Sequence, residues 1–264
     1  HDDITQLPKI HFSGFSDIQQ MPGAELIEAL ADSYHHVGLD DTIVVTRSNK
    51  RANIFNQGIR NMVLDRDEEL SQGDILMIVK NNYYWMEEER KKVSEERRVK
   101  SEELPAFLAN GDRAKVLRVR RRIDLYGFRF ATLLLQFPDY DNYELEATVL
   151  LDTLTSEAPA LTHEQQEQLF RQIEEDYQDI PLKADRMKAI RQDRFFNALQ
   201  VKFAYAVTCH KAQGGQWAHV YVDQGYMTDD MLTPDYIHWL YTAFTRATEK
   251  LYLVNWPETQ TATS

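Results

Sequence analysis

The chain has 264 residues, of which 43% are hydrophobic and 11% aromatic, as expected for a globular protein with its own core. Its net charge of -12 argues against nucleic-acid binding through overall charge, but a local basic groove stays compatible with it. The single cysteine, Cys209, excludes an internal disulfide and fits a cytoplasmic location, and no apolar run approaches the ~20 residues that cross a bilayer.

The first part of the chain predicts an α/β layout. Its start, His1-Asp2-Asp3-Ile4, is neither a signal peptide nor a natural beginning, which suggests a fragment boundary. Residues 10–15 predict a short strand, and residues 22–37 predict an amphipathic helix. The apolar run 42–46 predicts a buried parallel strand, followed by a helix from residue 50 to about 62.

A segment of different character, residues 65–199, is predicted to be an inserted domain. Short strands separated by turns predict a small β-barrel at about 70–151. The strand-like segments lie at residues 73–85 and 114–151. Residues 87–103 are dense in Glu, Lys and Arg and indicate a solvated loop or helical excursion. A helical extension is expected at about 155–197.

The α/β pattern returns near residue 200. The segments expected here are a strand at 203–207, a strand at 219–222, a helix at 234–247 and a strand at 251–254. Residues 1–64 and 200–264 are therefore predicted to form one discontinuous α/β domain that the insertion interrupts.

A polar loop follows the strand expected at 203–207, which should deliver it to the carboxyl edge of a parallel sheet. The residues of interest are Thr208, His210, Lys211, Gln213, Gly214 and Gln216. The hydroxyl and imidazole can hydrogen-bond phosphate oxygens, the ammonium can neutralise one, and the amides can bind ribose or phosphate. An ordinary polar turn is the alternative, but the full Thr-x-His-x-Ala-Gln-Gly string favours a functional loop.

Two arginines are candidates for phosphate contacts. Arg246 lies near the end of the helix expected at 234–247, where any cation gains ~0.3–1 kcal/mol from the helix dipole. Its planar fork also suits a γ-phosphate, where an arginine finger contributes ~10³–10⁵ in rate. Arg47 follows the buried strand 42–46 and is either a surface arginine or a second phosphate sensor.

A basic run lies in the strand-like segment of the insertion. Alternation along a strand would place Arg118, Arg120 and Arg122 on one face, where they could follow a DNA backbone. A solubilising barrel edge is the alternative. The aromatic run 83–85 could stack on bases, but packing in the barrel core or at its rim is the favoured interpretation.

Together these segments resemble the C-terminal half of a superfamily-one DNA helicase of the RecD-like, UvrD-related group. The resemblance covers nearly the whole chain and is weakest at residues 87–103 and 152–199. Thr46-Arg47-Ser48-Asn49 with Asn53 and Asn56 resembles motif IV, 208–217 motif V, 241–247 motif VI, and 73–83 with 110–112 an inserted SH3-like barrel.

The resemblance implies a fold and a set of roles. The fold would be a RecA-like parallel sheet domain of the P-loop NTPase type, lacking the P-loop itself, with an inserted SH3-like barrel and a helical extension. Arg47 and Arg246 would reach the γ-phosphate. Gln213, Gly214 and Gln216 would lie near the nucleotide, and Thr208, His210, Lys211, Asn53, Arg118 and Arg120 near nucleic acid. Position 216 is often glutamate in this family, so a ribose contact here would depend on an amide.

The other half of an ATP site is absent from the sequence. No Gly-x-x-x-x-Gly-Lys-Ser/Thr string occurs, so the phosphate cradle and the magnesium-binding hydroxyl are lacking. The acidic residues 65–69 indicate a solvated linker, and no metal site is expected. ATP and Mg²⁺ are therefore expected only in a full-length protein, with an N-terminal RecA-like domain and single- or double-stranded DNA as partners. Such a helicase would serve DNA repair or recombination, and this chain alone would be inactive. A non-catalytic DNA-binding or protein-interaction module derived from a helicase is the alternative.

Overall fold

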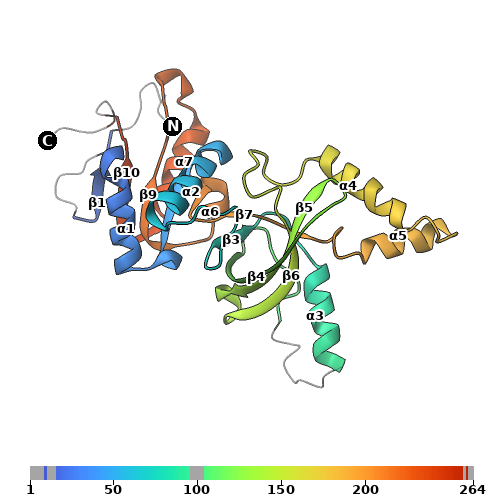
Figure 1. Ribbon diagram of the computed structural model, residues 1–264. Helices are drawn as coiled ribbons and strands as arrows, with labels where there is room; N and C mark the ends of the chain where they lie inside the picture. Colours follow the sequence, from blue (N-terminus) through green and yellow to red (C-terminus); the bar gives the residue numbers. More distant parts are fainter. Residues whose placement is uncertain (1–8, 11–15, 96–103, 258–259, 261–264) are drawn as a thin grey trace. The chain divides into compact units, whose positions relative to one another are not determined.

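The computed structural model describes residues 9–10, 16–95, 104–257 and 260. The chain divides into two compact units. The first unit is discontinuous and consists of His1–Asp67 and Tyr205–Ser264, whereas the second is the continuous segment Glu68–Ala204. Figure 1 labels helices and strands of both units where there is room.

The first unit contains a five-stranded sheet in the order β1-β10-β9-β2-β8. Each neighbouring pair of strands is parallel, so all carboxyl ends lie at one edge. The strands are β1 (Ile18–Met21), β2 (Thr42–Thr46), β8 (Ala206–Thr208), β9 (Trp217–Val222) and β10 (Ala247–Val254). This topology confirms the predicted α/β fold with a RecA-like parallel sheet.

Helices connect these strands in the manner of an α/β fold. They are η1 (Gly23–Glu25), α1 (Leu26–His36), η2 (Leu39–Asp41), α2 (Asn49–Gly58), the π-helical turn η3 (Ile59–Val63), α6 (Cys209–Ala212), η6 (Asp229–Met231) and α7 (Pro234–Phe244). Ser48 caps α2 by accepting a hydrogen bond from the Arg51 amide at 3.1 Å. Thr233 caps α7 in the same way, with a proline at the first helical position.

The second unit is built on a closed barrel of five strands, β3-β4-β5-β6-β7. Its strands are β3 (Ile75–Ile78), β4 (Arg113–Leu125), β5 (Phe128–Phe137), β6 (Tyr143–Leu150) and β7 (Leu199–Phe203). The strand pairs are antiparallel except for β6 and β7, which run parallel. Alternate residues of β5 are buried from Ala131 to Phe137, which fills the barrel interior.

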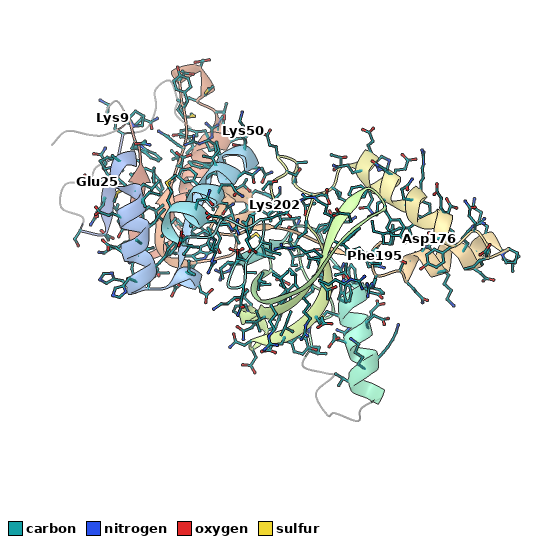
Figure 2. The ribbon with its side chains drawn as sticks, in the orientation of Figure 1. Lys9, Glu25, Lys50, Asp176, Phe195 and Lys202 are labelled. Atoms are coloured by element: carbon teal, nitrogen blue, oxygen red, sulfur yellow. The ribbon has the colours of Figure 1, made fainter. Side chains whose placement is uncertain are left out.

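Helices surround the barrel within the same unit. They are α3 (Tyr84–Glu95), η5 (Pro138–Tyr140), α4 (His163–Asp176) and α5 (Lys183–Arg191). A separate apolar cluster joins α4 and α5 to one end of β5 through Phe130, Leu169 and Ile190. Phe195 lies edge-on to Phe130, with the ring centres 5.1 Å apart, and Asp176 accepts a hydrogen bond from the Tyr126 hydroxyl. Figure 2 labels Phe195 and Asp176 in this layer. This layer explains the amphipathic pattern of the predicted helical extension.

The prediction of one strand at residues 203–207 is wrong, because this segment is divided between two strands of two different sheets. Residues up to Phe203 belong to β7, which closes the barrel, whereas β8 begins at Ala206 and belongs to the parallel sheet. The apolar run 203–207 covers the end of β7 and the start of β8, so hydrophobicity alone could not divide it.

Other element boundaries also differ from expectation. The strand expected at 10–15 falls largely on 11–15, outside the described residues, and the first strand of the sheet starts at Ile18. The segment 73–85 contains β3 but ends inside helix α3, which starts at Tyr84, and 96–103 lie outside the described residues. Helix α7 ends at Phe244, three residues earlier than predicted.

The prediction that Arg118, Arg120 and Arg122 lie on one face of β4 is also wrong. Two register shifts interrupt the pairing of β4 with β5. Arg118 lies opposite Leu134, and Arg122 lies opposite Ala131, three residues away on the partner strand. Because paired residues share a face and faces alternate along β5, Arg118 and Arg122 point to opposite sides.

Candidate nucleotide and nucleic-acid site

The carboxyl edge of the sheet brings two predicted site segments together. Thr46 at the end of β2 pairs with Thr208 at the end of β8, so Arg47 lies beside the start of the motif V loop. The exposed Arg47 guanidinium donates to Met227 and lies 5.4 Å from the centre of the Tyr236 ring. Arg47 is thus held near the first turn of α7.

An ion pair between a buried carboxylate and a partly exposed arginine at this edge was not predicted. Asp223 directly follows β9, is 2% exposed and receives two hydrogen bonds from Arg51 at 2.9 and 3.0 Å. The hydrogen bond to Asp223 raises the pKa of Arg51, so the guanidinium stays charged. A carboxylate placed directly after the apolar run 217–222 was the sequence signal that could have identified it. The pair ties α2 to the end of β9.

The motif V loop begins with the short helix α6. Thr208 is half-buried, His210 is exposed, and Cys209 is buried between them. Burial raises the pKa of the Cys209 thiol to about 11, and burial lowers the pKa of Lys211. The exposed imidazole and the half-buried ammonium are the two basic groups that the loop offers to a phosphate.

The glycine pair turns this loop back toward the start of β9. Gly214 has a φ of 81°, which favours glycine. A Cβ on Gly215 would lie 2.4 Å from the ring of Trp217, so the indole packs directly on the Gly215 backbone. Gln213 and Gln216 flank the pair and are both exposed. The loop therefore presents two amides beside a tightly packed turn.

Arg246 joins motif VI to this turn. Its guanidinium donates to the carbonyls of Thr242 and Gly215 and to the Thr245 hydroxyl, each at 3.1 Å. Its own carbonyl accepts a hydrogen bond from the Trp217 amide at 2.9 Å. The structure thus brings Arg246 together with the Gly214–Gln216 segment.

The two candidate arginines lie at opposite ends of α7. Arg47 contacts Tyr236 in the first turn, whereas Arg246 contacts Thr242 near the last turn. At ~1.5 Å per residue, the six residues from Tyr236 to Thr242 span about 9 Å along the helix axis. The structure does not bring Arg47 to Arg246.

The remaining candidates lie elsewhere. Asn53 is half-buried on α2. Arg118 and Arg120 are exposed on β4 of the second unit, where Arg120 forms a 2.6 Å ion pair with Glu146. Both partners of this pair are about half exposed, so it contributes little stability and leaves the arginine accessible.

The described residues do not form a magnesium site of three or more histidine, cysteine or acidic side chains. The sequence contains no Gly-x-x-x-x-Gly-Lys-Ser/Thr string that would form a phosphate cradle. None of the described helices combines the length and the apolar character needed to cross a bilayer.

Comparison with known proteins finds a similarity over the motif V and VI region. Residues 203–254 match the model of the UvrD-like helicase C-terminal domain, which confirms the resemblance over this segment. A search of curated proteins gave no match. Among solved structures, the Pif1 helicase from Candida albicans is similar, with 13% identity and a TM-score of 0.41. The alignment covers 85% of this chain and 47% of that helicase, so this chain spans about half of its length.

Proposed function

We propose that this chain is the second RecA-like domain of an ATP-dependent DNA helicase, and that it acts with an N-terminal RecA-like domain. The bond between Arg246 and the Gly215 carbonyl carries this proposal, because it links the arginine of motif VI to the motif V loop. In the full-length protein ATP and Mg²⁺ would bind mainly to the other domain, with DNA as the track.

Within this chain, Arg246 would contact the γ-phosphate, and Gln213, Gly214 and Gln216 would line the nucleotide. The Arg246 guanidinium donates to three acceptors in the chain, and a phosphate would compete with these acceptors for its N–H groups. Loss of the bond to Gly215 would release one end of the loop. Thr208 and His210 lie at the other end, so the loop offers a short route between nucleotide and nucleic acid.

Nucleic acid would contact Thr208, His210 and Lys211 at the carboxyl edge, with Asn53 nearby on α2. Arg118 and Arg120 of the barrel are further candidates for the DNA backbone. Arg47 remains a candidate phosphate sensor, although α7 separates it from Arg246. The pairing of β2 with β8 supports the nucleic-acid role of Thr208, His210 and Lys211, because it places Thr208 beside Arg47 at one edge of the sheet.

The test is ATP turnover by the full-length protein with and without single-stranded DNA. Arg246→Ala should lower the DNA-stimulated rate by ~10³-fold or more, and Arg246→Lys should restore little, because a point charge cannot replace the planar fork. Arg47→Ala in parallel reports whether the second arginine contributes. Undiminished turnover by Arg246→Ala would reject the assigned role.

A non-catalytic DNA-binding module is the second candidate. It is favoured by the engagement of the Arg246 guanidinium with three acceptors in its own unit, which is what a purely structural arginine would show. In that case Arg246→Ala would lower the unfolding temperature, and the wild-type full-length protein would bind DNA without hydrolysing ATP.

A further inference from the structure

The strand that carries Thr208 is weakly supported by the sheet itself. Strand β8 has three residues and lies at the edge of the sheet, where β2 is its only neighbour among the described strands. It begins three residues after Phe203, the last residue of barrel strand β7. Short edge strands open readily, so other contacts must hold β8 in register.

The side chain of Asn56 makes the contacts that a neighbouring strand would make. Asn56 lies on α2 and is 3% exposed. Its Nδ2 donates to the Ala206 carbonyl at 2.9 Å, and its Oδ1 accepts from the Ala206 amide at 2.7 Å. One side-chain amide therefore satisfies both backbone groups of Ala206, the first residue of β8, on the open side of the strand, where a further strand would otherwise be required.

A second contact joins the two segments that flank the insertion. Arg66 lies just before the first unit ends at Asp67, and Tyr205 is the residue at which this unit resumes. The Arg66 Nη1 donates to the Tyr205 hydroxyl at 2.6 Å. Tyr205 is 2% exposed, and its carbonyl accepts from the Val44 amide of β2 at 3.0 Å. This bond joins Arg66, where the chain leaves the first unit, to Tyr205, the residue immediately before β8.

We propose that Asn56 and Arg66 are positioning residues, which hold β8 against β2 and thereby place Thr208 and His210 for contact with nucleic-acid phosphates. This inference rests on the proposed function for its nucleic-acid part. Asn56 fixes the first residue of the three-residue strand, and Arg66 fixes the residue before it. The register of Thr208 then follows, because only Val207 intervenes.

The two contacts that hold β8, from Asn56 to Ala206 and from Arg66 to Tyr205, are called the clamp below. The clamp is tested by hydrogen exchange in the full-length protein, followed by mass spectrometry of peptides that cover residues 205–210. Asn56→Asp keeps the shape but cannot donate to the Ala206 carbonyl. We expect these amides to exchange roughly tenfold to a hundredfold faster, as loss of a buried hydrogen bond predicts. Gln57→Glu makes the same chemical change at the next residue of α2 and should leave the exchange unchanged.

The positioning role is tested with a fluorescent single-stranded oligonucleotide and the same variants. Asn56→Asp should raise the concentration for half-saturation by about tenfold, the equivalent of one lost hydrogen bond. ATP turnover without DNA and the KM for ATP should stay unchanged, which a general loss of structure would not allow. Arg66→Gln should act in the same direction, and Arg66→Lys should restore binding, because lysine can still donate to Tyr205.

Each outcome decides one part of the inference. Unchanged exchange in Asn56→Asp would overturn the clamp. Faster exchange with unchanged half-saturation would overturn the positioning role. A wild-type protein that binds no single-stranded DNA would reject the proposed function and the positioning role with it, whereas the exchange result would still decide the clamp.

Discussion

Gly215→Ala should destabilise the first unit, because the new methyl group has no space. Its Cβ would lie 2.4, 2.8 and 3.1 Å from three ring atoms of Trp217, compared with the ~3.5–4.0 Å of ordinary carbon contacts. The indole is 3% exposed and cannot move away freely, so the backbone must shift by about 1 Å. Such overpacking costs ~1–3 kcal/mol, or a fall in Tm of roughly 3–10 °C.

Thermal unfolding followed by tryptophan fluorescence measures this effect, since Trp217, Trp239 and Trp256 all belong to the first unit. Two glycines provide controls, because no heavy atom lies within 4 Å of a Cβ on either. Gly214→Ala should cost only the ~1–2 kcal/mol of its positive φ. Gly58→Ala, on α2, should stabilise by ~0.5–1 kcal/mol. A Gly215→Ala protein as stable as the wild type would refute the packing argument.

Three further outcomes follow from single contacts. Arg51→Ala should lower the free energy of unfolding by ~1–3 kcal/mol, because it leaves the buried Asp223 carboxylate without its donor; urea titration measures this, and Arg51→Lys should lose less. Burial raises the pKa of Cys209 to about 11, so the stability gained from the neutral thiol should be complete below pH ~8.5 and should be lost as the pH rises through 11. The native protein should therefore resist thiol reagents at pH ~8, and rapid labelling would contradict the burial of this thiol. Burial, followed by Lys250, lowers the His219 pKa, so stability present above ~6.5 should decline on acidification, and His219→Gln should flatten that decline.

Much of the fold could be predicted from local sequence signals. The buried run 42–46, the helix expected from residue 234 and the short strands expected in the insertion all correspond to observed elements. The boundary between β7 and β8 could not be predicted in this way, because both strands are buried and only their hydrogen-bonding partners distinguish them. The bulges in β4 were hidden for a similar reason, since register depends on the partner strand.

The candidate site was predictable in its residue types and less so in its spatial arrangement. The loop glycines and Arg246 stand together, as their motifs suggested. The separation of Arg47 from Arg246 depends on the length of α7 and on which strand ends meet, and no local pattern encodes it. The Arg51–Asp223 pair and the Asn56 amide bring together residues more than a hundred positions apart, so their partners emerge only from the fold.

The most direct test of the central claim compares ATP hydrolysis by this chain alone with hydrolysis by the full-length protein that contains it. The account predicts negligible turnover by the chain, with or without single-stranded DNA, because the phosphate cradle is absent from its sequence. The full-length protein should hydrolyse ATP in a DNA-stimulated manner that depends on Arg246. Turnover by the isolated chain at ordinary enzyme rates, or a full-length protein that hydrolyses no ATP, would contradict the account.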